Sequence, residues 1–296
     1  MKKIGIIGYG YVGKGIHDFF KDHYEIMVYE VNPKKEDLGI VNFSTQEEIN
    51  KNCDMAVICV PTPMFLDGSV DTLMVESSIQ WLETPVILLK STVPPGTTEK
   101  LVQMYKKRIA FSPEYMGESK YVTQWWLGIP DPKDMKKHDF QIFGGERETT
   151  SEILEYFKVV LGPIPKLIQT DSKTAELTKY MENCWGATKV MFCNEFAKIA
   201  ETFNVDYDEL RELWLLDGRI HRMHTAVFKD KRGFGGKCFP KDIHGMVRAA
   251  EKAGYVPELL KEVIKSNERI QDIQEAVATK KVSLENTASS IVASSK

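Results

Sequence analysis

The sequence predicts an α/β protein in which a doubly wound, parallel sheet is followed by an all-α domain with one long helix. Short apolar strands alternate with helical segments as far as about residue 170. Residues 172–203 contain one glycine and no proline, which suits a single helix. We therefore divide the 296 residues into a first domain, 1–170, a helical domain, 171–279, and a tail, 280–296, expected to be mobile.

Composition narrows the classes of function. A net charge of −3 with dispersed Lys and Arg disfavours nucleic acid as a partner. The apolar runs are far shorter than a membrane span, and the N-terminus lacks the pattern of a signal peptide, so no membrane partner is expected. Five cysteines without a C-x-x-C pair disfavour disulfides and a metal site, and indicate a reducing, cytoplasmic compartment. Cys59, Cys184 and Cys193 lie in apolar or helical patterns and are expected in the core.

The first strand, residues 3–8, leads directly into a glycine-rich turn and a helix that reaches about residue 21. The turn reads Gly8-Tyr9-Gly10-Tyr11-Val12-Gly13. Its glycines allow a pyrophosphate to approach the helix N-terminus, as in a Rossmann-type dinucleotide fold. The next strand, 25–30, ends in Glu30, 17 positions after Gly13. A carboxylate there binds the adenosine ribose and repels a 2′-phosphate, which favours NAD over NADP. A solvated strand end is the alternative for Glu30.

Two further strands end in polar, proline-rich segments. A helix over 45–50 and a strand over 55–60 precede Pro61-Thr62-Pro63, and a helix over 71–82 and a strand over 86–89 precede Thr92. Proline cannot continue the ladder of hydrogen bonds, so these strands must stop there. Thr92 is thereby placed at the carboxyl edge of the sheet, where it could bind a cofactor or water, or simply cap a turn.

Two acidic residues follow the fifth strand. A helix over 98–107 and a strand over 108–112 precede Glu114 and Glu118, which are four residues apart. That spacing predicts one face of a helical turn and suits a general base or a water-orienting pair, with solvated loop acids as the alternative. Residues 119–138, which include Trp125 and Trp126, are expected to form an irregular excursion. Strands 140–143 and 165–169 and a helix over 149–161 complete the first domain.

The long helix carries a lysine and an asparagine on one face. Lys179 and Asn183 are at i and i+4, and apolar Leu177, Tyr180, Met181 and Trp185 around them predict a packed helix. A buried lysine there needs a partner or a ligand anion. A helix over 206–216 and a basic stretch follow, and helices over 241–253 and 257–276 come last. The basic stretch contains Arg219 and Arg222, which suit a phosphate or a solvated turn equally.

A glycine-rich loop presents the remaining cysteine. It reads Gly233-Phe234-Gly235-Gly236-Lys237-Cys238-Phe239-Pro240-Lys241-Asp242. An ammonium group at Lys237 or Lys241 would favour the reactive thiolate of Cys238. The alternative is a flexible loop with a small buried thiol.

Taken together, these motifs resemble the UDP-glucose/GDP-mannose dehydrogenase family. The matching segments are Gly8–Gly13, Pro61–Pro63, Ser91–Pro94, Ser112–Glu118, Ala175–Asn183, Asn194-Glu195 and Gly233–Asp242, and they occur in the family's order as far as about Arg269. The resemblance implies NAD-dependent oxidation of a nucleotide sugar, UDP-glucose above all, at C6 to the uronic acid. The resemblance further implies that two NAD are used per turnover and that the product serves polysaccharide biosynthesis.

The resemblance also implies roles for individual residues. Cys238 would form a thiohemiacetal and then a thioester, Lys179 and Asn183 would stabilise the oxyanion, and Asp242 would assist proton transfer through water. Glu118, Glu114 and Thr92 would act at the hydrolytic step. Further contacts to the cofactor are implied for Tyr11, Val12, Pro61, Thr62, Thr92 and Lys241. Contacts to the substrate are implied for Glu114, Lys179, Asn183, Gly235, and Arg219 or Arg222.

Departures from the family pattern leave other readings open. Family members continue into a third, UDP-binding domain, whereas this sequence stops soon after Arg269, so we expect a short form, a homodimer through the long helix, and possibly a separate chain supplying that domain. Lys237 replaces a serine common before the cysteine. One alternative is a two-electron 3-hydroxyacid dehydrogenase, which needs neither Cys238 nor Glu118. Another is a catalytically silent protein that binds NAD or a nucleotide sugar.

Overall fold

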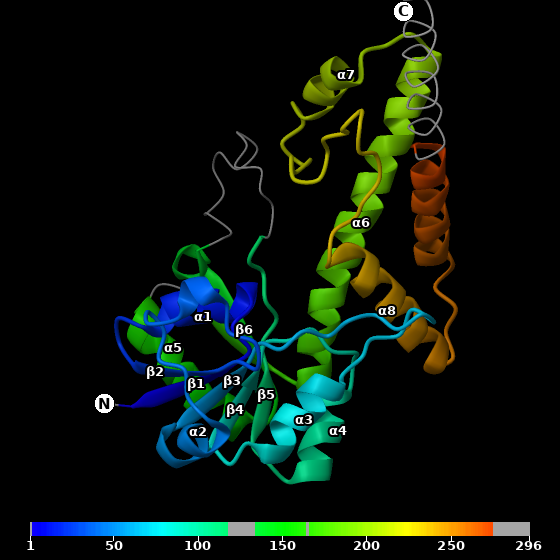
Figure 1. Ribbon diagram of the computed structural model, residues 1–296. Helices are drawn as coiled ribbons and strands as arrows, with labels where there is room; N and C mark the ends of the chain where they lie inside the picture. The colour runs from blue at the N-terminus through cyan, green and yellow to red at the C-terminus, as the bar shows by residue number, and fades with distance from the viewer. Residues whose placement is uncertain (1, 118–133, 164–165, 275–296) are drawn as a thin grey trace, which may run out of the picture. The chain divides into compact units, whose positions relative to one another are not determined.

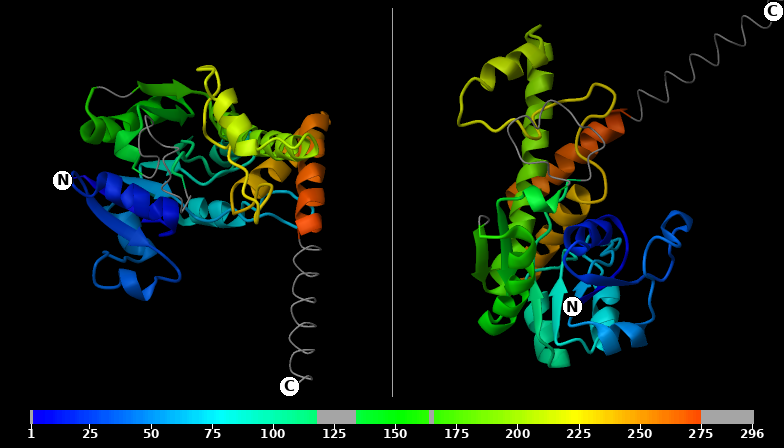
Figure 2. Two further views of the ribbon diagram at one scale, coloured as in Figure 1. Left: turned by 90° about the horizontal axis from the view of Figure 1, so that it is seen from above. Right: turned by 90° about the vertical axis from the view of Figure 1, so that its left-hand side faces the viewer.

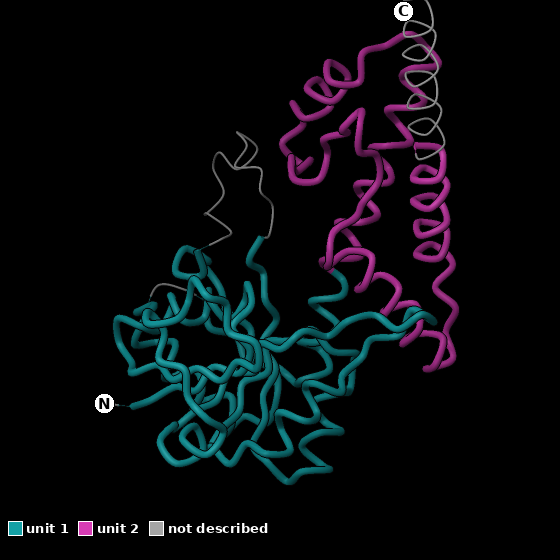
Figure 3. Tube along the Cα trace, viewed as in Figure 1, with its two compact units in different colours: residues 1–181 teal, residues 182–296 magenta. Residues whose placement is uncertain are grey.

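The computed structural model describes residues 2–117, 134–163 and 166–274 (Figure 1). The chain forms two compact units, residues 1–181 and 182–296 (Figure 3), each of which is described by itself. Their boundary falls inside helix α6 (Ser172–Thr202), eleven residues beyond the predicted domain boundary at 170. Glu118, the two tryptophans at 125 and 126, and the tail 280–296 lie outside the described residues.

Unit 1 is built on a seven-stranded sheet in the order β2-β1-β3-β4-β5-β6-β7 (Figures 1 and 2). The strands are β1 (Lys3–Ile7), β2 (Glu25–Tyr29), β3 (Met55–Ile58), β4 (Val86–Leu89), β5 (Ile109–Phe111), β6 (Phe140–Gly144) and β7 (Lys166–Thr170). The first five strands are mutually parallel, whereas β6 runs antiparallel to β5 and parallel to β7. Because β1 lies between β2 and β3, the chain changes direction across the sheet at β1 and β3, where such folds bind ligands.

Helices cover both faces of this sheet, which confirms the doubly wound architecture. The helices α1 (Tyr11–Phe20) and α5 (Arg147–Leu161) pack on one face, and α2 (Gln46–Asn52), α3 (Leu73–Trp81) and α4 (Thr97–Tyr105) on the other (Figure 1). Alternate strand residues reach opposite cores: Ile4 and Ile6 join the first, and Ile7 joins the second. Short 3₁₀ turns, η1 (Lys35–Asp37) and η3 (Met135–Lys137), complete the described part of the unit.

Unit 2 is helical. It contains most of α6, then α7 (Tyr207–Trp214), α8 (Phe239–Lys252) and a helix over 258–274. Met191, Ile243 and Val263 lie in its core. A methyl group at Gly186 of α6 would come within 2.6 Å of the Phe239 ring, so the glycine lets α8 approach α6 closely. The predicted order of helices is confirmed, and their described ends differ from the prediction by at most two residues.

The surroundings of Lys179 are less packed than the sequence predicts. Tyr180 is fully buried, but Leu177, Met181 and Trp185 are exposed on another side of α6. The expectation of packed apolar residues is therefore confirmed for Tyr180 and wrong for the other three, because these lie on a face of the helix that the described residues of the chain leave uncovered. Within the described residues, no helix is both long enough and apolar enough to cross a membrane.

Candidate active site

The glycine turn after β1 is shaped by close packing. Gly8 has φ of +90°, and a methyl group at Gly13 would lie 2.1 Å from the Gly8 carbonyl oxygen, so a side chain cannot be accommodated at Gly13. Gly10 is the N-cap of α1 and supplies no side chain to its first turn. The backbone N–H groups at this helix N-terminus are thus available to a pyrophosphate, which is the cradle that a dinucleotide requires.

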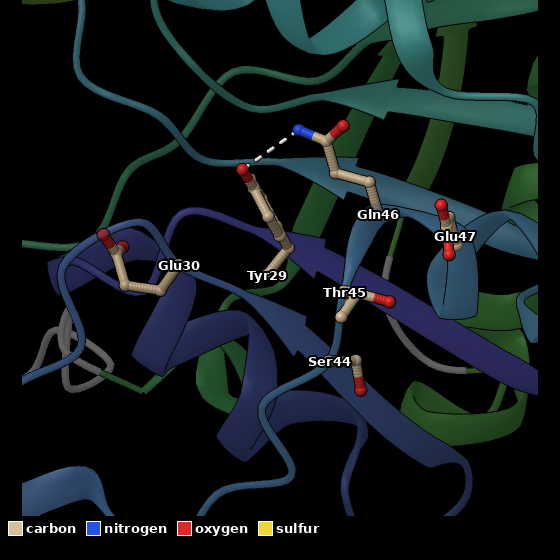
Figure 4. A pocket seen from close by; sticks show the side chains of 6 residues that line it. All are labelled: Tyr29, Glu30, Ser44, Thr45, Gln46 and Glu47. Atoms are coloured by element: carbon tan, nitrogen blue, oxygen red, sulfur yellow. Dashed lines mark hydrogen bonds between the residues drawn. The ribbon is translucent and has the colours of Figure 1, made fainter.

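Glu30 lies at the carboxyl end of β2 beside this turn. Its carboxylate accepts hydrogen bonds from the backbone N–H of Tyr9 at 2.7 Å and of Asn32 at 3.0 Å. Glu30 also lines a pocket (Figure 4). The other lining residues are Tyr29, Ser44, Thr45, Gln46 and Glu47. A carboxylate and hydroxyls in one pocket at this edge suit the ribose of NAD, so the residues present fit the cofactor.

The sequence did not predict that the residues at the start of α2 would line this pocket. Gln46 donates from Nε2 to the Tyr29 hydroxyl at 3.0 Å, and Thr45 forms a capping box with Glu48 at the start of α2. The T-x-x-E spacing from Thr45 to Glu48 was the available signal. This capping box fixes the start of α2, which lines the pocket together with the end of β2.

Neighbouring strands bring the other predicted cofactor residues to the same edge of the sheet. Pro61 and Thr62 follow β3, which lies next to β1, and Thr92 follows β4, which lies next to β3. Thr62 is buried and Thr92 half-buried, whereas Pro61 is exposed. From α1, Tyr11 is exposed and Val12 half-buried. The predicted cofactor-binding residues of unit 1 thus share the carboxyl edge with the glycine turn.

The segment after β5 differs from its prediction. Residues 112–117 form no helical turn, so Glu114 shares no helical face there, and Glu118 lies outside the described residues. Instead, Glu114 forms a buried ion pair with Lys90, whose Nζ lies 3.0 Å from its Oε2. The Lys90 ammonium also donates to the Ser112 hydroxyl at 3.2 Å and to the Pro113 carbonyl at 3.1 Å.

The environment of Glu114 fixes its charge. Burial alone would raise the pKa of Glu114, but the Lys90 ammonium and two backbone N–H groups lower it below the ordinary value. Those N–H groups belong to Tyr115 and Met116 and lie 2.9 and 3.0 Å from Oε1. Glu114 is therefore a persistent carboxylate, which is better suited to orienting a ligand than to taking a proton. Lys90 was missed because a lysine at a strand end gives no signal of burial.

The first turns of α6 carry Lys179 and a helix-capping glutamate. Lys179 is buried, and its ammonium lies 5.0 Å from the centre of the Tyr115 ring. Glu176, one turn earlier and fully buried, accepts from the N–H and hydroxyl of Thr98 at 2.8 and 2.7 Å and from the N–H of Gly96. It thereby caps α4 from another helix and ties the segment after β4 to α6. This contact joins residues 78 apart or more in sequence, so no local pattern indicated it.

In unit 2, the structure gathers two predicted residues around the buried carboxylate of a third. Asn183 donates from Nδ2 to Asp242, and the Lys241 ammonium pairs with its other oxygen. Asp242 and Asn183 are buried, and Lys241 is half-buried. The backbone N–H of Asp242 donates to the Cys238 carbonyl at 2.9 Å. The carboxylate thus lies one helical turn after the thiol.

Cys238 is the N-cap of α8, because that helix begins at Phe239 and not at Lys241 as predicted. Pro240 in the first turn was the signal that the prediction overlooked. Cys238 is exposed, and the other four cysteines are buried, which confirms the expected core positions of Cys59, Cys184 and Cys193. Burial, with a smaller contribution from Asp242, raises the pKa of the Cys184 thiol to about 12. Of the five thiols, the one at Cys238 is therefore accessible from solvent.

The two candidate arginines pair with nearby acids. Arg219 is highly exposed and binds Asp217 through Nε and Nη2, whereas Arg222 binds both carboxylate oxygens of Glu212 at 2.7 Å. Gly235 is exposed, and no atom lies within 4 Å of where its Cβ would be. Each guanidinium group is thus paired with a carboxylate, and the position of neither arginine indicates a ligand site. Among the described residues, no group of three His, Cys, Asp or Glu side chains could hold a metal ion.

The fold and these side chains define a dinucleotide-binding unit followed by a helical unit with an accessible thiol. Residues 22–157 match the NAD binding domain, and residues 173–269 the central domain, of the UDP-glucose/GDP-mannose dehydrogenase family. The chain belongs to this family, and NAD is the cofactor of the matched N-terminal domain.

Individual relatives agree with this assignment. The chain is 30% identical over 273 residues to UDP-glucose 6-dehydrogenase YwqF of Bacillus subtilis, covering 87% of this chain and 58% of the relative. It is 31% identical over 242 residues to UDP-glucose 6-dehydrogenase of Rickettsia bellii, covering 77% and 52%. A UDP-glucose dehydrogenase structure from Pyrobaculum islandicum matches with a TM-score of 0.77 and 28% identity, covering 94% and 72%. The chain spans about half to three-fifths of the length of these two curated relatives.

Proposed function

We propose that the protein catalyses the NAD-dependent oxidation of a nucleotide sugar, UDP-glucose first among them, at C6 to the uronic acid. One observation carries the proposal: the exposed Cys238 occupies the N-cap position of a helix, one turn before a buried carboxylate, Asp242, that Asn183 and Lys241 hold. A helix N-terminus favours the thiolate, which is the nucleophilic form. Two oxidations at one carbon require a covalent hold on the intermediate aldehyde, and a thiolate provides it.

The proposed reaction has two oxidations and one hydrolysis. NAD, when bound, accepts the hydride in each oxidation. The C6 alcohol first loses a hydride and a proton to give the aldehyde, and the Cys238 sulfur adds to its carbon while the oxygen gains a proton, giving a thiohemiacetal. Loss of a second hydride and proton leaves a thioester. Water then adds at the carbonyl carbon, the C–S bond breaks, and the carboxylate and the thiol are released.

Residues of the chain have separate proposed roles in these steps. Lys179 and Asn183 supply an ammonium and an amide for the developing oxyanion, and they are one turn apart on α6. Asp242 relays protons through water. Glu118 and Thr92 act on the hydrolytic water, and Glu114, held as a carboxylate by Lys90, orients it or the substrate.

We also propose binding roles that follow the family pattern. Gly8, Gly10, Gly13 and Glu30 hold the cofactor with Tyr11, Val12, Pro61, Thr62, Thr92 and Lys241. Substrate contacts come from Glu114, Lys179, Asn183 and Gly235, and from Arg219 or Arg222 once it leaves its acidic neighbour. The proposal places the protein in the cytoplasm, which five cysteines outside any disulfide support.

The test is NADH production by the purified protein on a panel of UDP- and GDP-sugars. We expect two NADH per sugar consumed, and we expect Cys238→Ser to abolish uronic acid formation. Cys53→Ala removes a buried thiol from unit 1 and should keep turnover, so it is the matched control. One NADH per product, unaffected by Cys238→Ser, would instead indicate a two-electron dehydrogenase. NAD binding without turnover on any sugar would indicate a binding protein.

We propose in addition that the protein is a homodimer through α6. Large apolar side chains lie exposed along this helix and at Phe203, directly after its end, at spacings of three, four and seven residues, and Trp185 and Phe203 are 62% and 74% exposed. The others in the stripe are Phe192, Phe196 and Ile199. Such a stripe is costly in water and is typical of an interface. Analytical ultracentrifugation should give a dimer for the wild type and a monomer for Phe196→Glu, and a monomeric wild type would refute this proposal.

A further inference from the structure

One face of the helix over 258–274 presents three side-chain amides to the backbone of residues 229–234. They are Asn267, Gln271 and Gln274, at i, i+4 and i+7, so they lie on one side of the helix. We call these three residues the amide row. Gln274 accepts from the Arg232 N–H at 3.0 Å and donates to the Lys229 carbonyl at 3.3 Å.

Asn267 holds Phe234 from both sides of its backbone. Its Oδ1 accepts from the Phe234 N–H at 2.7 Å, and its Nδ2 donates to the Phe234 carbonyl at 3.1 Å, as a neighbouring strand would. Gln271 donates to the same carbonyl at 3.0 Å. Asn267 and Phe234 are both buried, so the two bonds between them are shielded from water, and their loss would leave buried backbone groups unpaired.

A second buried amide holds the preceding residue from α6. Asn194 accepts at Oδ1 from the Gly233 N–H at 3.2 Å. A methyl group at Gly233 would lie 2.4 Å from Asn267 Oδ1, which shows how closely the loop backbone approaches the amide row. The entry to the cysteine loop is thus enclosed by amides of two helices.

Beyond Phe234, the loop has few contacts until α8 begins. Gly235, Gly236 and Lys237 are exposed, and the two glycines have open space where a Cβ would lie. At the other end, Phe239 packs against Gly186. The exposed segment that presents Cys238 is therefore fixed at its two ends, by the amide row at Phe234 and by α8 at Phe239.

We propose that Asn267 is a positioning residue for Cys238, and that the amide row, with Asn267 at its centre, sets the direction of the thiol at the start of α8. The inference rests on the proposed function in treating Cys238 as the nucleophile. Asn267 does not touch the reacting atoms in this proposal. It acts by holding the peptide group at Phe234, four residues before the thiol.

The test compares Asn267→Leu, which removes both hydrogen bonds to Phe234, with Asp272→Asn, an exposed change on the same helix. Alkylation of Cys238 by iodoacetamide is followed by mass spectrometry from pH 6 to 9. We expect Asn267→Leu to slow alkylation at pH 7 by about fivefold or more and to move its pH profile upward, because the thiolate no longer sits fixed at the helix N-terminus. NAD affinity, which depends mainly on residues of unit 1, should stay unchanged, as should both readouts in Asp272→Asn.

Where turnover is measurable, kcat should fall in Asn267→Leu while KM for NAD does not change. An unchanged alkylation profile, or faster alkylation with an unchanged pH profile, would overturn the inference, since Asn267 would then be a purely structural residue or a barrier to access. If Asn267→Leu fails to fold by circular dichroism, Gln271→Leu, which removes one of two donors to the Phe234 carbonyl, is expected to give the same shifts at about twofold. A wild type without turnover on any sugar would refute the proposed function but leave this alkylation test intact.

Discussion

Two loops carry candidate catalytic groups, and they are anchored in different ways, one by a buried ion pair and the other by neutral side-chain amides. In unit 1, the segment after β5 is fixed by a buried ion pair, with Lys90 Nζ 3.0 Å from Glu114. In unit 2, the entry to the cysteine loop is fixed by neutral amides, of which Asn267 makes two hydrogen bonds to Phe234. A buried charge destabilises the fold strongly once its partner is lost, and its protonation depends on pH. A buried amide that loses its partner costs less, and its hydrogen bonds depend less on pH. The kind of anchor therefore decides whether the position of a loop depends on pH.

The largest expected effect is the loss of the charged anchor. Lys90→Met leaves the Glu114 carboxylate buried without its ion-pair partner, and we expect unit 1 to lose about 3–5 kcal/mol of stability. Hydrogen exchange of peptides covering residues 86–117, measured in urea, reports this unit separately. Lys100→Met is the matched control, because Lys100 is exposed and lies 3.7 Å from Glu76. A loss in Lys90→Met as small as in this control would show that the pair does not anchor the loop.

The neutral anchor is probed by Gly233→Ala. Gly233 has φ of +78°, which costs an alanine about 1–2 kcal/mol, and the methyl group would displace Asn267 Oδ1. We expect unit 2 to lose about 2–3 kcal/mol in total, seen as faster hydrogen exchange around residues 229–239. Gly235→Ala meets no neighbour and should change stability by less than about 0.5 kcal/mol. Equal losses in the two variants would contradict the contact with Asn267.

Acid should separate the two anchors. The pKa of Glu114 is lowered in the folded state, so its stabilisation is present above the ordinary value of 4.5 and is lost as pH falls through the lower folded value. The difference in unfolding free energy between wild type and Glu114→Gln should therefore shrink as the pH falls below 4.5. The same difference for Asn267→Leu should stay constant over that range. Urea titrations at several pH values give the unfolding free energy of each variant relative to wild type and check both expectations. A difference that stays constant for Glu114→Gln would show that the ion-pair anchor does not respond to pH.

The smallest effect is expected for Lys237, whose charge lies in the exposed part of the loop that the amide row anchors. Lys237 is exposed beside Cys238, and solvent screens its charge. Lys237→Ser should slow alkylation of Cys238 at pH 7 by about two- to fivefold without changing stability. Lys229→Ser, also exposed but nine residues before the thiol, should leave the rate unchanged. A rate unaltered by Lys237→Ser would mean that the helix N-terminus alone governs the thiolate.

The sequence predicted most of the fold because its signals are local. The strands of unit 1 are short apolar runs, and their order of appearance with intervening helices defines a parallel sheet. The glycine turn could be predicted for the same reason, since Gly8 and Gly13 are spaced for one contact within six residues. Lys179 and Asn183 share a helix face by their spacing alone.

The anchors could not be predicted, because they join residues far apart in the chain. Lys90 and Glu114 are 24 positions apart, and Asn267 and Phe234 are 33 apart. A lysine after an apolar strand is ordinarily exposed, and an asparagine in a helix is ordinarily solvated, so neither residue type signals its burial. The helical turn expected for Glu114 and Glu118 failed because the Lys90 contact and the backbone N–H groups after Glu114 define a different local conformation.

The distribution of the five cysteines also gives the protein an internal measure of its own unfolding. One thiol, at Cys238, is exposed, and the other four are buried, two in each unit. A reagent that counts thiols should therefore find one rapidly in the native state and five in the unfolded state. Because Cys53 and Cys59 belong to unit 1 and Cys184 and Cys193 to unit 2, a transient count of three would reveal that one unit opens before the other. The order of opening could then be read by identifying which pair reacted, without any engineered probe.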